Sequence, residues 1–151
     1  MSEQSKPADH SMREHRGGCH CGNLRWTLAS TLAPAELPAR ACQCSFCTHH
    51  GALSTSDPTG RMRFEVDDAA LLLRYRFATA SADFLICRRC GVYVGALMED
   101  GGLWFAIANL NTLEGREALQ PVPQPMVYDG EAEGARRGRR SARWTPSDSL
   151  S

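Results

Sequence analysis

Cys87-Arg88-Arg89-Cys90-Gly91 is the stretch that constrains the fold of this chain most strongly. Its two-residue spacer turns the backbone so that both sulfurs can face one metal ion, and the glycine accommodates the turn that follows. Such a knuckle needs two further thiolates from elsewhere in the chain. Because the free energy of metal binding becomes folding free energy, these thiolates would staple distant segments together.

Two further cysteine clusters precede the knuckle, namely Cys19-His-Cys21 and Cys42-Gln-Cys44-Ser-Phe-Cys47. The chain has seven cysteines, an odd number that excludes complete disulfide pairing within one chain. A C-x-C disulfide would also be strained, whereas thiolates this close suit a small tetrahedral cation. The count therefore predicts a four-sulfur zinc site and a three-sulfur site whose zinc keeps a position open for chemistry or ligand binding.

Cys19 and Cys21 are the natural partners of the knuckle, which leaves Cys42, Cys44 and Cys47 as a compact tripod. Other partitions stay open from the sequence: Cys42 and Cys44 with the knuckle, or two zinc-binding pairs and a spare cysteine. Two other chemistries compete with zinc. An iron–sulfur cluster usually takes four thiolates, one more than the tripod has, and a thiol redox switch would need the tripod free of metal.

Three histidines, His20, His49 and His50, lie beside the sulfur clusters. Each is a candidate zinc ligand or proton donor, although a histidine beside a thiolate cluster is more often a surface residue. The His49-His50 pair directly follows the tripod, and we take His49 as a candidate substrate-binding residue.

Length and charge narrow the class of protein. At 151 residues the chain is expected to hold one hydrophobic core. Lys+Arg and Asp+Glu both number 17, so no general affinity for polyanions is implied and nucleic acid is not an expected partner. The apolar runs are too short to span a bilayer, and the polar N-terminus has no apolar signal region. We therefore expect a cytoplasmic protein with reduced cysteines and no membrane association.

Short segments of alternating polarity, separated by turn residues, predict a mainly β fold of small zinc-stapled sheets. We expect residues 1–16 to be a disordered leader, 17–130 the zinc-binding domain and 131–151 an Arg-rich C-terminal tail. A helical turn is expected at 45–50 and a short helix at 112–119. The expected strands are 23–29, 39–42, 52–56, 62–66, 71–77, 82–87, 91–98 and 103–108.

The C-terminal tail carries an arginine cluster over Arg136–Arg143, followed by Trp144. One interpretation is a basic arm for phosphate or an acidic partner. The other is a solvated tail, or a tail that lies back on the domain with Trp144 packed. Glycines and the flanking acidic residues dilute the charge and favour the second interpretation.

The order of the motifs resembles the glutathione-dependent formaldehyde-activating enzyme family, also called the GFA or CENP-V domain family. The resemblance covers Gly17 to Asp129 and rests on Gly-Gly-Cys-His-Cys-Gly, then Cys-x-Cys-Ser-x-Cys with Gly-Ala following, then Cys-x-x-Cys-Gly-Val. The stretch from Ile107 to Glu114 also resembles a family segment in which an asparagine, here Asn109, precedes a leucine–acidic pair. Tyr93-Val94-Gly95 departs from the His or Gln followed by Pro-Phe that many relatives have there.

The resemblance implies an Mss4-like, tent-shaped arrangement of small sheets around about two zinc ions per chain. A structural zinc would be held by Cys19, Cys21, Cys87 and Cys90, and a catalytic zinc by Cys42, Cys44 and Cys47. The implied reaction joins glutathione and formaldehyde into S-hydroxymethylglutathione, which is a carbon–sulfur lyase reaction run in reverse. Asn109 is then a candidate substrate-binding residue. The alternative is a non-catalytic, zinc-stabilised binding module whose basic tail meets a protein or nucleic acid.

Overall fold

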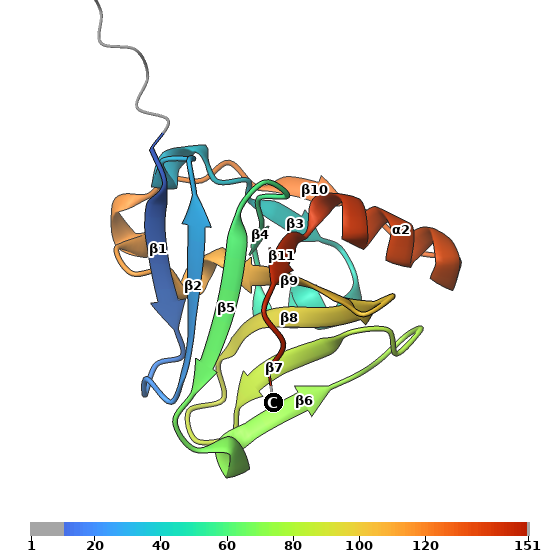
Figure 1. The fold of residues 1–151 in the computed structure, drawn as a ribbon, viewed down its shortest axis with the longest axis horizontal. Helices are drawn as coiled ribbons and strands as arrows, with labels where there is room; N and C mark the ends of the chain where they lie inside the picture. The colour runs from blue at the N-terminus through green and yellow to red at the C-terminus, as the bar shows by residue number, and fades with distance from the viewer. Residues whose placement is uncertain (1–10, 151) are drawn as a thin grey trace, which may run out of the picture.

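The computed structural model describes residues 11–150, which form a mainly β fold with two α-helices (Figure 1). Residues 1–10 of the leader expected over 1–16 lie outside the described residues. The strands are β1 (Arg13–Gly18), β2 (Leu24–Ser30), β3 (Arg40–Cys42), β4 (Ser54–Thr55), β5 (Arg61–Val66), β6 (Leu72–Tyr75), β7 (Asp83–Cys87), β8 (Tyr93–Asp100), β9 (Leu103–Asn109), β10 (Gln124–Met126) and β11 (Thr145–Ser147). The α-helices are α1 (Ser45–His50) and α2 (Glu133–Arg143), and the 3-10 turns are η1 (Pro34–Glu36), η2 (Ala69–Leu71), η3 (Leu110–Thr112) and η4 (Arg116–Ala118).

The first part of the sheet is the antiparallel set β1, β2 and β5. In β2 every second side chain is buried, as the alternation of polarity predicts. Strand β1 begins at Arg13 and pairs with β2 as far as Ser30, so ordered structure starts before the expected boundary at Gly17. Inside β1, His15 is buried and its ring donates to the carbonyl oxygen of Leu32 at 2.8 Å.

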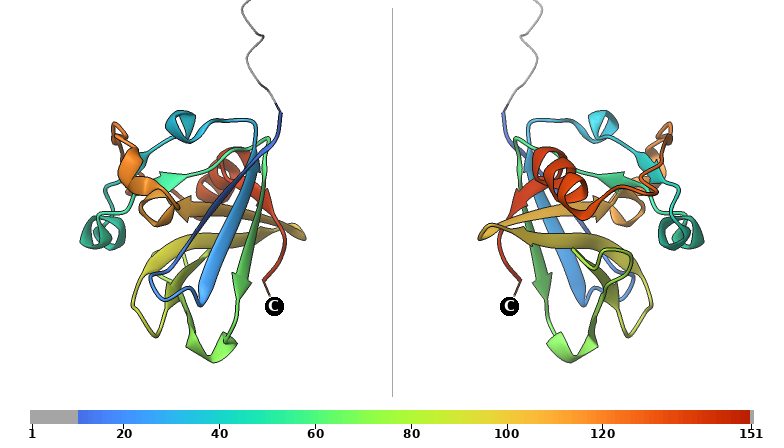
Figure 2. Two further views of the ribbon diagram at one scale, coloured as in Figure 1. Left: turned by 90° about the vertical axis from the view of Figure 1, so that its left-hand side faces the viewer. Right: turned by 90° about the vertical axis from the view of Figure 1, so that its right-hand side faces the viewer.

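The second part is the antiparallel meander β6, β7, β8 and β9. Figure 2 shows these strands crossing β1, β2 and β5 at a steep angle. Tyr93 to Met98 of β8 are all buried because both faces of this strand are covered. Leu97 packs in the core shared with β2 and β5, whereas Met98 packs in a second cluster with Cys47 and Trp144.

Strand β11 joins the two parts, because it lies between β5 and β9. It runs antiparallel to β9 and parallel to β5, which makes the sheet mixed. The segment 131–151, expected as a tail, therefore contributes a helix and an internal strand to the domain. Trp144 is only 5% exposed, which confirms the interpretation that this segment lies back on the domain.

The mainly β class predicted from the sequence is confirmed. The helix expected at 112–119 is instead the two turns η3 and η4, because Gly115 between them has a left-handed backbone (φ 78°) that interrupts a helix. Within residues 11–150, neither helix has the length and hydropathy that a membrane crossing requires.

Candidate metal centres

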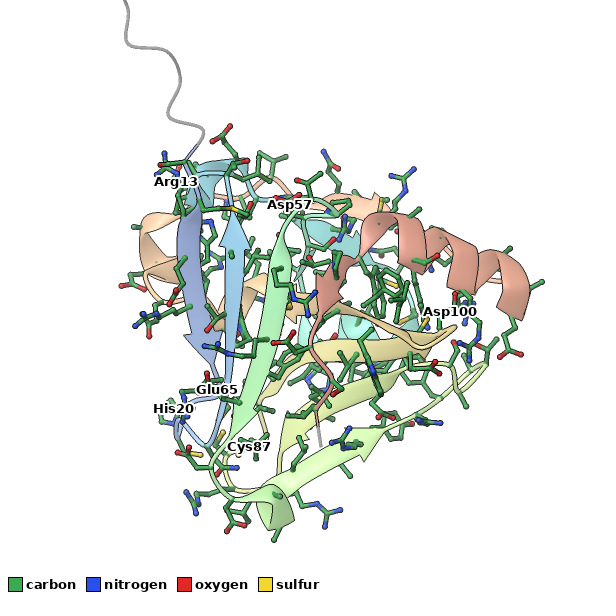
Figure 3. The ribbon with its side chains drawn as sticks, viewed as in Figure 1. Arg13, His20, Asp57, Glu65, Cys87 and Asp100 are labelled. Carbon is green, nitrogen blue, oxygen red and sulfur yellow. The ribbon has the colours of Figure 1, made fainter. Side chains whose placement is uncertain are left out.

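Four cysteines from two turns meet at one end of the molecule, where Figure 3 labels His20 and Cys87. The Sγ atoms of Cys19, Cys21, Cys87 and Cys90 all lie within 4.8 Å of one another. Cys21 Sγ is 3.7 Å from Cys19 Sγ and 3.6 Å from Cys87 Sγ. Two thiolates at a tetrahedral angle on zinc are about 3.8 Å apart, so this set fits such an ion.

Both turns of this four-sulfur site are shaped by glycine. Gly22 (φ 84°) and Gly91 (φ 78°) have left-handed backbones, which residues with a Cβ rarely adopt. Gly91 N donates to Cys87 O at 2.8 Å and closes the knuckle. In the other turn Leu24 N donates to Cys19 Sγ at 3.3 Å, a contact that stabilises a thiolate.

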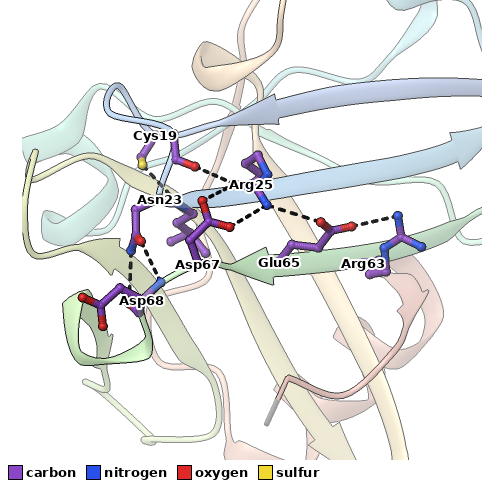
Figure 4. A network of polar contacts seen from close by, with 9 residues as sticks. Cys19, Asn23, Arg25, Arg63, Glu65, Asp67 and Asp68 are labelled. Atoms are coloured by element: carbon purple, nitrogen blue, oxygen red, sulfur yellow. Dashed lines mark hydrogen bonds and ion pairs between the residues drawn. The ribbon is translucent and has the colours of Figure 1, made fainter.

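A polar network holds the first turn in place (Figure 4). The buried Asn23 side chain accepts from Asp68 N at 2.9 Å and donates to Asp68 O. Arg25 donates to both carboxylate oxygens of Asp67 at 2.9 Å, and also to Gly22 O at 2.8 Å. The start of β2 is thereby tied to the end of β5, which fixes the position of the Cys19–Cys21 turn.

The thiols of this site have divergent acidities. Burial raises the pKa of Cys19 to about 11. The backbone N–H of Asn23 lowers the pKa of Cys21. Burial also opposes ionisation of Cys90, but the N–H groups of Cys21 and Val92 outweigh it and lower the pKa of Cys90 to about 6. Backbone donors aimed at sulfur favour thiolates, the form that binds metal.

The remaining cysteines form a separate three-sulfur site. The Sγ atoms of Cys42, Cys44 and Cys47 lie within 4.8 Å of one another. Cys42 ends β3, Cys44 is the N-cap of α1, and Cys47 is buried in the first turn of that helix. Cys44 Sγ accepts from Cys47 N at 3.4 Å, so the cap that starts the helix also points its sulfur toward the other two.

Ionisation of one thiol in this site disfavours ionisation of the other two. The Cys47 thiol lowers the pKa of Cys42 to about 6, and Arg139 acts in the same direction. The contact with Cys42, together with burial, raises the pKa of Cys47, and burial raises the pKa of Cys44. Ionising all three therefore requires a cation among them, as a metal ion would provide.

A cavity of about 130 Å³ opens beside the three-sulfur site. All three of its cysteines line this cavity. An apolar wall is formed by Phe77, Phe84, Ile107 and Trp144, and the cationic residues in the lining are Arg40, Arg136, Arg139 and Arg140. The four-sulfur site has no residue in this lining.

The structure brings the seven predicted cysteines together as four and three, which is the expected partition. Asn109 and His49 lie outside the cavity lining. Asn109 is buried and ties strands together, donating to Tyr93 O at 2.9 Å and accepting from Leu53 N at 3.4 Å. The His49 ring is exposed and hydrogen-bonded to Ser45 O of its own helix.

Neither His20 nor His50 belongs to one of the two sulfur groups. His20 is exposed on the Cys19–Cys21 turn, and His50 is exposed and contacts Phe46 in a tilted arrangement with ring centroids 4.7 Å apart. The arginines of the cavity were not predicted as site residues. The arginine cluster and Trp144 were visible in the sequence, but nothing there indicated that they would meet Cys42 and Cys47.

No model of a known protein family matches the chain. Among solved structures, it is similar to a Rhodobacter sphaeroides protein with a TM-score of 0.55 and 28% sequence identity. The similarity covers 74% of this chain and 99% of that protein. It supports the architecture described above and carries no information on activity.

Proposed function

We propose that this protein is a zinc enzyme of carbon–sulfur chemistry, related to the glutathione-dependent formaldehyde-activating enzymes. It would act in the cytoplasm on a small thiol such as glutathione and on an aldehyde such as formaldehyde. The observation that carries the proposal is the position of Cys42, Cys44 and Cys47 in the wall of a cavity. A set of three thiolates with space beside it can receive a fourth ligand from solution.

The two sulfur sets would have different roles. Cys19, Cys21, Cys87 and Cys90 supply the four thiolates of a closed structural site, and they join turns that are far apart in the sequence. Cys42, Cys44 and Cys47 would supply three ligands, which would leave a position on their zinc open for substrate. The folded segment 133–147 belongs with the catalytic domain in this proposal, because its residues complete the cavity.

In the proposed reaction the thiol sulfur forms a bond to the aldehyde carbon, the C=O π bond breaks, and the thiol proton ends on the new hydroxyl oxygen. Bound zinc would supply thiol acidification and Lewis-acid polarisation of the aldehyde. The three cysteines would hold this ion, and Phe77 and Phe84 would exclude water from one side of the cavity. Arg139 adds a positive charge that favours thiolates at Cys42.

The test is the Cys44→Ser variant, with Ser45→Ala as the control because Ser45 is exposed next to Cys44 and offers no sulfur. Metal content should fall from about two zinc ions per chain to about one in Cys44→Ser. Formation of S-hydroxymethylglutathione, followed by NMR, should fall to the uncatalysed rate while circular dichroism stays native. Ser45→Ala should match the parent protein in all three measurements.

Two results would contradict the proposal. Unfolding of Cys44→Ser would assign the three-sulfur site to stability instead of catalysis. If the parent protein holds both metal ions but adduct formation stays at the uncatalysed rate, the protein does not catalyse the proposed carbon–sulfur reaction. The alternative of a basic-tailed binding module has less support, because Arg136 and Arg139 are paired with Glu131 inside the fold.

A further inference from the structure

One arginine of the cavity lining, Arg140, is buried without a carboxylate partner among residues 11–150. It is only 8% exposed, and within residues 11–150 it forms no ion pair with a carboxylate. Its Nη1 donates to Ser81 Oγ at 2.8 Å, and its guanidinium lies 4.9 Å above the Trp144 ring. Its Nε has no hydrogen-bond partner in the described part of the chain. A buried guanidinium normally requires a matched anion, so these contacts are incomplete.

A second arginine of the same cavity is in a similar position. Arg40 donates to Ser56 Oγ and makes no ion pair with any described carboxylate. Burial lowers the pKa of Arg40, and it lowers that of Arg140 to about 10. Burial is the largest cause at both residues, and neighbouring arginines act in the same direction.

The other two arginines of the lining differ from this pair. Arg136 and Arg139 both contact Glu131, at 3.3 and 3.0 Å. Arg139 also lies 3.5 Å above the Tyr128 ring. Arg136 and Arg139 thus share one carboxylate, whereas Arg40 and Arg140 have no carboxylate partner among the described residues.

We propose that Arg40 and Arg140 form an anion-binding subsite that takes a carboxylate group of the substrate thiol. Nη1 of Arg140 is engaged by Ser81 and its Nε is enclosed without a partner, so this guanidinium keeps donors and a charge for an anion that enters the cavity. Because the same cavity is lined by Cys42, Cys44 and Cys47, one ligand can present its carboxylate to the arginines and its sulfur to the metal centre. The identification of the ligand as a thiol rests on the proposed function, whereas the anion site itself does not.

The experiment is calorimetric titration of the metal-loaded protein with two matched thiols, 3-mercaptopropionate and the neutral 3-mercaptopropanol. Propionate and inorganic phosphate serve as probes without sulfur. The parent protein should bind the carboxylate thiol at least about 10-fold more tightly than the neutral thiol, since charged hydrogen bonds are the strong ones. Arg140→Gln should abolish this preference and leave the affinity for the neutral thiol unchanged.

Arg143→Gln is the matched control, because Arg143 is an exposed arginine of the same helix that lies outside this cavity. It should keep the full preference. Arg40→Gln and Arg140→Lys test the subsite in case Arg140→Gln does not fold. Arg40→Gln changes a less buried residue, and Arg140→Lys keeps the charge but loses the paired donors of the guanidinium. Both should reduce the preference while circular dichroism and zinc content stay native.

The outcomes separate the two proposals. Equal binding of both thiols to the parent protein would overturn the subsite and leave the thiol chemistry standing. If propionate binds and neither thiol binds, the result supports the anion subsite and contradicts the proposed thiol chemistry. Loss of zinc in Arg140→Gln would show that the metal-bound thiolates are the missing counter-ion, which overturns the subsite. Tighter binding of phosphate than of propionate would overturn the assignment to a carboxylate.

Discussion

At the scale of single residues, Gly17 shows how a glycine beside a metal motif serves the hydrophobic core. A Cβ at this position would lie 2.4 Å from Trp26 Cε2 and 2.5 Å from Thr112 O. Trp26 is 1% exposed, and its Nε1 donates to Thr112 Oγ1 at 2.8 Å, so the ring cannot move aside without losing this bond. The close approach of β1 to the core therefore depends on the missing side chain.

We expect Gly17→Ala to lower the free energy of unfolding by about 2 kcal/mol, the usual cost of overpacking a tight core site. Gly134→Ala is the control, because Gly134 is in α2 with open space around its Cα and should gain about 0.5–1 kcal/mol from helix propensity. Urea denaturation of both variants measures the two effects. Equal stability of Gly17→Ala and the parent would show that β1 shifts freely.

Asp57 gives a pH dependence at the same scale. Burial opposes its ionisation, but Ser30 Oγ at 2.6 Å and the Thr59 N–H at 2.9 Å donate to its carboxylate and leave the pKa of Asp57 lowered. The stabilisation is therefore fully present above the unfolded pKa of about 3.9 and is lost as pH falls through the lower folded value.

The stability gap between the parent protein and Asp57→Asn should consequently be constant from pH 7 to 5 and shrink below pH 4. Taking the difference cancels the protonation of the metal ligands, which both proteins share. Chemical denaturation at several pH values measures the gap. If the stability gap widens on acidification instead, the folded protein favours the neutral carboxyl of Asp57 and the prediction is wrong.

At the scale of elements, periodicity predicted the strands that have one solvent-facing side. The alternation in β2 and β5 is the burial pattern that the sheet shows. The Ser45–His50 turn was also predicted, and it is α1. The helix α2 was not predicted, because arginines instead of an apolar stripe occupy most of its buried and half-buried positions, and it contains Gly134 and Gly138.

Some residues of the candidate site could likewise be predicted from the sequence, and others could not. The cysteines could be found from the sequence because a metal needs sulfurs at short spacing, and this requirement is local. Arg40 and Arg140 could not, because they are separated by most of the chain and only the packing of α2 against the meander brings them to one cavity. Arg137 shows this packing, donating to Glu99 O at 2.9 Å at the tip of β8.

The anchor of α2 and β11 is Trp144, and Trp144→Ala should destabilise the protein by about 3–5 kcal/mol, as expected for a large aromatic side chain lost from a core. Val127→Ala is the control, because Val127 is 69% exposed and its truncation should change stability by less than about 0.5 kcal/mol. Thermal unfolding followed by circular dichroism compares them. A small effect of Trp144→Ala would mean that α2 docks through its arginines alone.

At the scale of the whole molecule, the two parts of the sheet are held together at two separate places. The four-sulfur site joins the β1–β2 turn to the β7–β8 turn, and β11 bridges β5 and β9. The three-sulfur site lies on β3 and α1 and crosslinks neighbouring residues only. Loss of metal should therefore affect the fold very differently at the two sites.

We expect Cys87→Ser to lower the free energy of unfolding by more than about 4 kcal/mol, a size typical of losing a structural metal, or to prevent folding. Cys44→Ser should cost far less. Metal stoichiometry by mass spectrometry and hydrogen exchange of the β1–β2 turn test the contrast during stepwise chelation. Release of both ions in a single step with global unfolding would contradict the separation of roles.

The position of β11 also sets an order for assembly of the chain on the ribosome. Asp57 N donates to Thr145 Oγ1 across 88 positions of sequence, and the strand that carries Thr145 fills the place between β5 and β9. Until residues 145–147 leave the exit tunnel, β5 and β9 lack their partner β11 on the edges that face it, and unpaired edges promote aggregation. The nascent chain is thus expected to need a chaperone or early metal capture at Cys19, Cys21, Cys87 and Cys90 to keep its two halves in register.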